Sequence, residues 1–291
     1  MLATDYHFDT RRAIYDPVPS PMTPSYEFES IMASKSTKSK RSSLLSPATP
    51  TAWFENNDYR LTVSQRIIIL SLTKSGFLKP SIANLEATVA WAVLCDLIIN
   101  NKVYTFQCTS KKKLNKTKYC LCITDSHPVD DPAQNLMLQC IQEAIKKDSK
   151  RAIRHIIREI CSAGFGKRIL DSNIHLLTSM RILKIRKDIK LGFFSLGAFP
   201  IQKLETKAEI RRQLNESLNG HTTSDMYALA CLLKCHNMLE KEVAKFEGCN
   251  KPAMKNTCNN LLIMKGSGLN SSEQVICSHL GHVMSELQNR R

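Results

Sequence analysis

The 291-residue sequence contains no apolar segment long enough to cross a bilayer as a helix. The longest apolar stretch, Leu85–Ile99, has fifteen residues and includes Glu86 and Asp96. A spanning helix needs about 20 mostly apolar residues. The N-terminus also lacks the apolar segment typical of a signal peptide. These absences predict that any contact with a membrane is peripheral.

The sequence also lacks the short motifs of the common enzyme classes. It has no Gly-x-Ser-x-Gly elbow, no phosphate-binding loop and no dinucleotide-binding fingerprint, and it has only ten glycines. The segment Gly164–Lys167 has too few glycines to wrap a phosphate, and the histidines are scattered over different predicted helices. The sequence therefore predicts a protein that is not an enzyme and needs no cofactor.

The eleven cysteines lack the repeated spacing of a zinc site. Cys120 and Cys122 alternate along a predicted strand, while Cys231 and Cys235 lie one helical turn apart, beside His236. Structural zinc needs four ligands, usually in regularly spaced pairs. The pattern instead predicts no metal, buried free thiols and a reducing compartment.

Net charge and proline content both change at about residue 58, which indicates a boundary there. Residues 1–58 hold six of the eleven prolines, many Ser and Thr, and a net charge of −1. They predict a disordered Ser/Thr/Pro-rich tail. Residues 59–291 carry a net charge of +16 and predict one globular, mainly helical domain. A basic folded surface suits partners that carry phosphate, either a nucleic acid or an anionic membrane.

Helical signals begin at Thr62, whose spacing from Gln65 predicts a capping box. A buried helix over Ile67–Leu72 and a second helix over Ser81–Ile99 follow, with Gly76 expected to end the first. Further helices are predicted over Asn135–Ile145, Lys150–Ile160, Lys167–Arg181, Thr206–Leu218, Thr223–Ala244, Pro252–Met264 and Ser272–Gln288.

Two β-hairpins interrupt these helices. Alternating residues predict the first over Lys102–Cys108 and Tyr119–Thr124, and the second over Ile182–Arg186 and Leu191–Leu196, around Lys187–Lys190. The second carries the cations and rings that an interfacial membrane anchor needs: Lys184, Arg186, Lys187, Lys190, Phe193 and Phe194. Packing of both phenylalanines against the helices is the alternative interpretation.

The order helix, helix, hairpin, helices, hairpin, helices resembles that of the Golgi phosphoprotein 3 family. The segments that carry the resemblance lie within residues 61–265, and they are Leu61–Leu72, Val93–Val103, Asp125–Asp131 and Tyr227–Glu240. Their order and spacing are more specific than any one of them.

The resemblance implies a mostly helical fold without an enzymatic site. It implies a peripheral membrane protein that binds phosphatidylinositol 4-phosphate on the cytoplasmic face of the Golgi and is also found in the cytosol. It further implies an adaptor in vesicle-mediated transport or glycosyltransferase retention, which links glycosyltransferase cytoplasmic tails to coatomer. A hydrophobic hairpin would aid membrane contact and self-association.

The positions that match the family's lipid pocket are altered in this sequence. Ser81 and Ala90 stand where the family has a tryptophan and an arginine, and Lys167 and Arg168 are near the positions of two further arginines. Lysine binds phosphate as a point charge, without the bidentate geometry of arginine. Two other hypotheses are a helical nucleic-acid-binding protein, which is less favoured, and a degenerate family member that acts only as a protein scaffold.

Overall fold

The computed structural model describes residues 60–79, 84–109, 117–185, 190–191, 194–195, 198–219, 222–245 and 271–288. At residues 109, 117, 190, 191, 194 and 195 it describes the backbone alone. The predicted tail over residues 1–58 and the predicted helix Pro252–Met264 lie outside the described residues.

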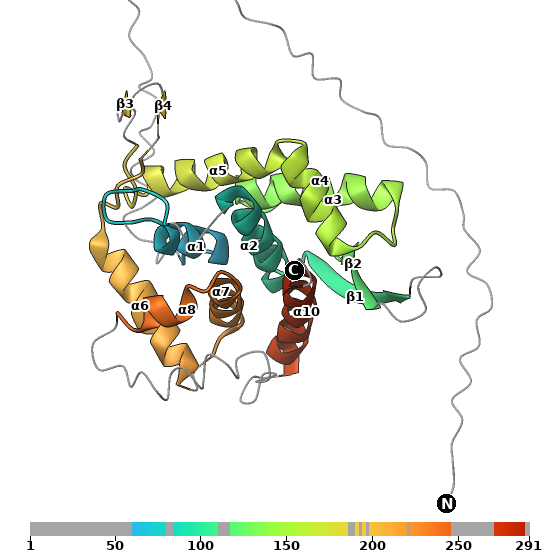
Figure 1. The fold of residues 1–291 in the computed structure, drawn as a ribbon. Coiled ribbons are helices and arrows are strands. Elements are labelled where there is room, and N and C mark those ends of the chain that lie inside the picture. Colours follow the sequence, from blue (N-terminus) through green and yellow to red (C-terminus); the bar gives the residue numbers. More distant parts are fainter. Residues whose placement is uncertain are drawn as a thin grey trace, which may run out of the picture. The chain divides into compact units, whose positions relative to one another are not determined.

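The predicted mainly helical fold with two hairpins is confirmed (Figure 1). The described elements are α1 (Val63–Ser71), α2 (Leu85–Ile99), β1 (Val103–Thr109), β2 (Thr117–Ile123), α3 (Pro132–Lys147), α4 (Ile153–Ser162), α5 (Phe165–Ser179), β3 (Lys190–Leu191), β4 (Phe194–Ser195), α6 (Leu204–Leu218), α7 (Ser224–Cys235), α8 (Leu239–Val243) and α10 (Ser271–Gln288). In the described part of the chain, no helix combines the length and apolarity that a membrane span requires.

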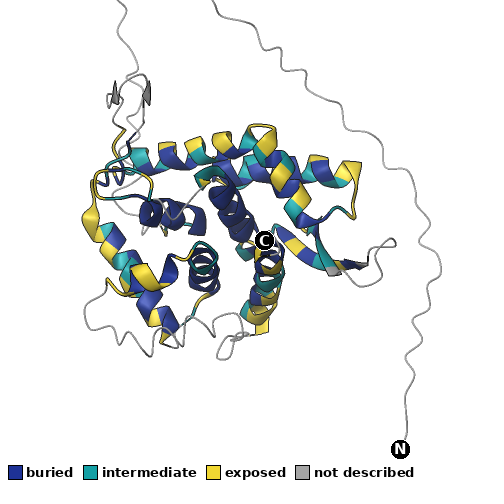
Figure 2. Cartoon of the chain, in the orientation of Figure 1, coloured by how far each residue is buried: buried dark blue, intermediate teal, exposed yellow. Residues whose placement is uncertain are grey.

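The helix α2 forms the centre of the core, and the other helices pack around it. Asn84 caps its start by accepting a hydrogen bond from the Ala87 amide at 2.8 Å. The residues from Ala87 to Ile98 are all buried, and Figure 2 shows the helix dark blue along most of its length. A helix that is apolar on every face has to be enclosed by neighbours. It contacts α1, α3, α4, α5, α7 and α10.

The helix α1 begins with the predicted capping box, which is confirmed. The Thr62 side chain accepts from the Gln65 amide, and the Gln65 side chain accepts from the Thr62 amide. All nine residues of α1 are buried, Arg66 among them. The helix ends at Ser71, so the expectation that Gly76 ends it is wrong.

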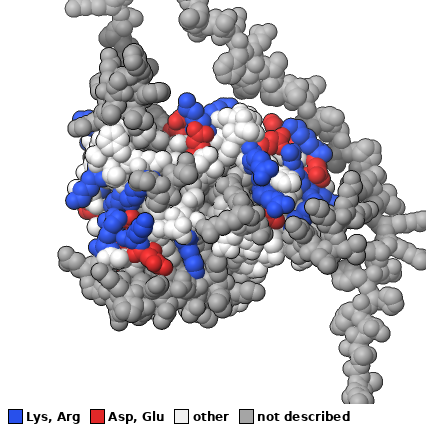
Figure 3. Space-filling view, viewed as in Figure 1, with Lys and Arg blue, Asp and Glu red and all other residues white. Residues whose placement is uncertain are grey.

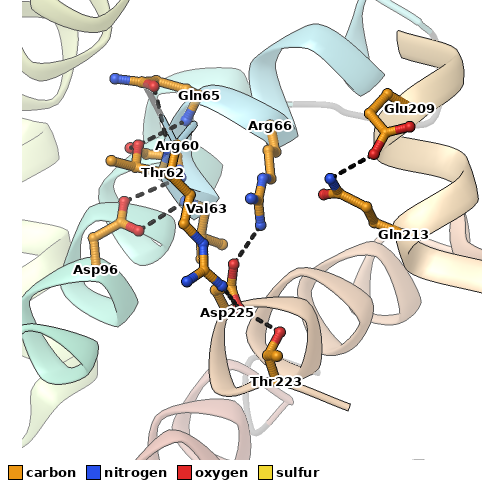
Figure 4. Close-up of polar contacts among 11 residues, drawn as sticks. Arg60, Thr62, Val63, Gln65, Arg66, Asp96, Glu209, Gln213, Thr223 and Asp225 are labelled. Carbon is orange, nitrogen blue, oxygen red and sulfur yellow. Dashed lines mark hydrogen bonds and ion pairs between the residues drawn. The ribbon is translucent and has the colours of Figure 1, made fainter. Parts of the chain in front are cut away.

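Two buried carboxylates hold α1 in place (Figure 4). Asp96 of α2 accepts hydrogen bonds from the backbone amides of Val63 and Ser64, at 2.8 and 3.0 Å. Asp225 of α7 accepts from the Arg66 guanidinium at 2.6 Å. The first contact satisfies amides that the helix itself leaves unpaired, and the second compensates a buried charge.

The first hairpin is confirmed, with an antiparallel register that pairs Val103 with Ile123 and Thr109 with Thr117. A disulfide joins Cys108 to Cys120, with Cα atoms 6.3 Å apart. The expectation of free thiols is therefore wrong for these two residues. The register explains the pairing, because Cys108 and Cys120 lie diagonally on one face of the ladder.

The second hairpin has a different register from the predicted one. Leu191 pairs with Phe194 and Lys190 with Ser195, so Lys190 belongs to strand β3 and not to the expected turn. Leu183, which begins the hairpin, pairs with Ile201. The predicted second strand ended at Leu196 and so did not include Ile201.

The predicted helix Thr223–Ala244 is two helices, α7 and α8. The break follows His236, where Asn237 has a φ of 53°. Asparagine tolerates this left-handed conformation, which ends a helix. The break turns α8 toward α6, with which it shares a group of charged side chains.

Candidate functional site

Of the four residues predicted to contact a lipid headgroup, three lie in the described part of the chain. Ala90 is fully buried in α2, so its side chain is not available to a ligand. Lys167 and Arg168 are exposed on the first turn of α5, where the Arg168 guanidinium lies 5.3 Å from the centre of the Phe165 ring. Ser81 lies outside the described residues.

The predicted membrane hairpin is described at its base and in part of its ladder. Lys184 is exposed, Lys190 lies in β3 and Phe194 in β4. The side chains of Lys190 and Phe194, and the whole of residues Arg186, Lys187 and Phe193, lie outside the described residues.

Three exposed apolar side chains surround the base of this hairpin. Leu78, Ile185 and Leu204 have exposed fractions of 41%, 43% and 46%. Their segments are hydrogen-bonded to one another, because the Phe199 amide donates to the Gly76 carbonyl and the Lys184 amide to the Pro200 carbonyl. Exposed lysines adjoin Ile185 and Leu204 in the sequence, at positions 184 and 203, and Lys74 is exposed in the loop that carries Leu78. We call these three residues the apolar hairpin base. The sequence had indicated only the hairpin itself, because Leu78 and Leu204 lie in other segments.

Gly76 makes the hairpin base possible. A Cβ atom at this position would lie 2.3 Å from the backbone of Phe199 and Pro200, and its φ is 88°. Only glycine adopts this conformation without strain and permits such a close approach. The loop after α1 is thereby held against the end of the hairpin.

Lys and Arg gather in two parts of the face shown in Figure 3, one over α6 and α8 and one toward α3 and α4. The first is built around the buried carboxylate of Glu242, which pairs with Lys79, Arg211 and Lys245. Their positive charges are engaged within the protein.

A cavity of about 720 Å³ lies between α4 and the start of α2. Its lining residues are Asn84, Ala87, Arg154, His155, Arg158, Cys161 and Ser162. The spacing of the α4 residues places them on one side of the helix, opposite Ile153, Ile156, Ile157 and Ile160, which are buried. Sequence reasoning missed this cavity, because the polar face of an amphipathic helix is most often simply solvated.

The cavity has a positive electrostatic character. The pKa of His155 is lowered, first by partial burial and then by the neighbouring charges of Arg154, Arg158 and Arg151. Glu286 of α10 opposes this effect weakly. The same arginine charges that disfavour a protonated imidazole would favour a bound anion. Within the described residues, no group of three or more His, Cys, Asp or Glu side chains is arranged to hold a metal ion.

Comparison with known proteins gives one family match. Residues 63–261 match the family described as Golgi phosphoprotein 3 (GPP34). Among curated proteins, none matches the sequence significantly. The matched range runs from the first residue of α1 to beyond α8, and it includes both hairpins and the α4 cavity.

Proposed function

The chain belongs to the Golgi phosphoprotein 3 family, and we propose that it is a peripheral membrane protein of the Golgi that binds a phosphoinositide headgroup, phosphatidylinositol 4-phosphate. Family membership supports a Golgi-associated function, and the family is of a non-enzymatic, adaptor type. In the proposed role the protein works as an adaptor in vesicle trafficking or glycosyltransferase retention. Coatomer, glycosyltransferase cytoplasmic tails and a second copy of the chain are the proposed partners.

The apolar hairpin base is the observation that carries this proposal. Leu78, Ile185 and Leu204 are each exposed, and backbone hydrogen bonds join their segments near the foot of a hairpin whose sequence contains Phe193 and Phe194. Apolar side chains beside cations suit insertion at an anionic bilayer surface. A nucleic acid would instead favour cations without apolar neighbours, and so the membrane is the better-supported partner.

Charge and insertion should both be required. Each cation contributes about 1 kcal/mol near an anionic leaflet, so the four hairpin cations supply at most about 4 kcal/mol, which is roughly millimolar binding. Burial of one phenylalanine ring adds about 1.5 to 3 kcal/mol. Neither contribution holds the protein on a membrane alone.

Vesicle flotation tests the proposal. The full chain should float with phosphatidylcholine vesicles that contain phosphatidylinositol 4-phosphate, but not with phosphatidylcholine alone, and it should not bind an RNA control. Replacing Phe193 and Phe194 with serine should abolish flotation at physiological salt and leave weak binding at low salt. Replacing Lys184, Arg186, Lys187 and Lys190 with glutamine should remove the salt dependence.

Other results would overturn parts of the proposal. Unchanged flotation of the phenylalanine variant, or its failure to fold, would place both rings in the protein core. Binding to RNA without flotation would favour the nucleic-acid hypothesis, and binding to neither would favour a protein scaffold.

A further inference from the structure

We propose that the cavity beside α4 binds a phosphate monoester group, held chiefly by Arg154 and Arg158. The inference deepens the proposed function and rests on it where the phosphate belongs to a lipid. It places the headgroup-binding cations on α4, whereas the positions carried over from the family are Ala90 of α2 and Lys167 and Arg168 of α5.

The three arginines at this end of the molecule differ in how they are neutralised. Arg151 forms an ion pair with Glu159. Arg154 has only Glu286 nearby, with a distance of 3.8 Å between Nε and Oε2 that exceeds a hydrogen bond. Arg158 has no acidic partner within ion-pair distance among the described residues. Within the described residues, Arg158 therefore lines the cavity without an ion-pair partner, and Arg154 has only a long ion pair with Glu286.

Their placement costs helix stability unless an anion is bound. Arg154 and Arg158 are four residues apart on one helix face, and like charges at this spacing destabilise a helix by about 0.2 to 0.5 kcal/mol. His155 lies between them with a lowered pKa. An anion in the cavity would relieve the repulsion between the two guanidinium groups.

The opposite side of the cavity is the start of a long, buried helix. Asn84 and Ala87 belong to the first turn of α2, whose fifteen residues give that end a partial positive charge. The Asn84 side chain accepts from the Ala87 amide, so this amide is satisfied within the turn. This end adds to the field of the arginines and does not by itself define the site.

The chemistry of the lining limits the ligand class. Arginine is suited to phosphate because its planar guanidinium donates two parallel hydrogen bonds to one anion. The volume of about 720 Å³ is within the usual range of ligand pockets and leaves room for a polar ring beside the phosphate. A phosphoinositide headgroup and a soluble sugar phosphate share these features.

Binding of soluble and membrane-borne probes tests the inference. Inositol 1,4-bisphosphate, inorganic phosphate and vesicles containing phosphatidylinositol 4-phosphate are titrated against the full chain. The Arg158→Gln variant should bind each responding probe about ten- to a hundred-fold more weakly, as expected for a lost charge-assisted hydrogen bond. The Lys167→Gln, Arg168→Gln variant tests the positions carried over from the family. The matched control is Lys241→Gln on α8, which removes one exposed cation outside the cavity and should change binding less than threefold.

The outcomes distinguish the cavity from the wider proposal. If inositol 1,4-bisphosphate binds saturably through Arg158 and the protein also floats with vesicles, the phosphate site in the cavity and the membrane proposal are both supported. The same binding without flotation supports the cavity as a site for a soluble phosphate and overturns the membrane proposal. Flotation that depends on Lys167 and Arg168, but not on Arg158, overturns the inference and leaves the proposed function standing. A wild-type chain that binds no soluble probe also overturns it.

Discussion

At the scale of single residues, Glu242 is the most heavily engaged carboxylate of the described chain. Its side chain is 1% exposed, and its oxygens accept from Lys79, Arg211 and Lys245 at 2.5 to 2.8 Å. Burial is the largest influence and raises its pKa, but the hydrogen bonds and charges of Lys245, Lys79 and Arg211 together lower the pKa to about 2. Three cations on different segments thus depend on one negative charge.

We expect the Glu242→Gln variant to lose about 3 kcal/mol of unfolding free energy, because it leaves partly buried cations without compensation. The control is Glu216→Gln, which removes a half-exposed carboxylate paired with Arg212 and should cost less than about 1 kcal/mol. Urea denaturation measures both. Equal losses for the two variants would contradict the central role of Glu242.

A second residue-scale prediction concerns pH. Burial is the largest influence on Asp96 and raises its pKa to about 7, although hydrogen bonds from Ser64 and Val63 lower it. In the unfolded chain an aspartate titrates near 3.9. The folded state therefore binds the proton more tightly, and the stability that it gains is complete below about pH 4 and is lost as pH rises through about 7.

The Asp96→Asn variant isolates this effect, because it removes the titration from both states. Between about pH 5 and pH 8 the wild type should lose about 2 to 3 kcal/mol of unfolding free energy relative to the variant. Denaturant unfolding at both pH values gives the difference. A difference that does not change with pH would show that Asp96 is ionised throughout the range.

At the scale of elements, the apolar hairpin base extends the proposed membrane contact beyond the hairpin. Replacing Leu78 and Leu204 with serine should lower vesicle affinity about tenfold or more. The reason is that burial of each leucine side chain at the bilayer would contribute about 1 kcal/mol to the binding free energy. The control is Val275→Ser on α10, which is 57% exposed and belongs to a different part of the fold. An affinity equal to that of the control variant would exclude the base from the contact.

The elements that were predictable from the sequence are those specified by neighbouring residues. The capping box at Thr62 and Gln65 and the alternation of β1 and β2 need only local chemistry. The division of α7 from α8 was missed because Asn237 is a weak signal inside a periodic pattern. The register of the second hairpin was missed because Leu183 pairs with Ile201, eighteen residues away.

The candidate site was less predictable than the elements. Arg66 interrupts an apolar run, and only the fold brings Asp225 to it from 159 residues away. In the sequence, Arg154 and Arg158 resemble the cations of any solvated helix face. Only the fold places the start of α2 opposite them and so forms the cavity. Local pattern does not contain such long-range juxtapositions.

At the scale of the whole molecule, residues 1–58 are proposed to form a tail that the fold does not need. A chain that begins at Asp58 retains Arg60, which donates to Asp225 at 2.8 Å. Its unfolding temperature should lie within a few degrees of that of the full chain, since a shift of about 1 kcal/mol moves the midpoint by only about 2 to 4 °C at this size. Thermal unfolding of both proteins measures the difference. If the unfolding temperature of the shorter chain falls well beyond that range, part of the tail belongs to the folded structure.

The ion pair between Arg66 and Asp225 also has a consequence for the protein's synthesis. The two residues are separated by 159 positions, so α1 leaves the ribosome long before its partner α7 exists. At about 5 to 20 residues per second, the delay is roughly 10 to 30 s. Throughout it, a nine-residue helix that is buried along its whole length in the finished protein lacks its charge partner and the part of its cover that α7 provides. The nascent chain is expected to need a chaperone over this interval. Faster translation between α1 and α7 should reduce that need.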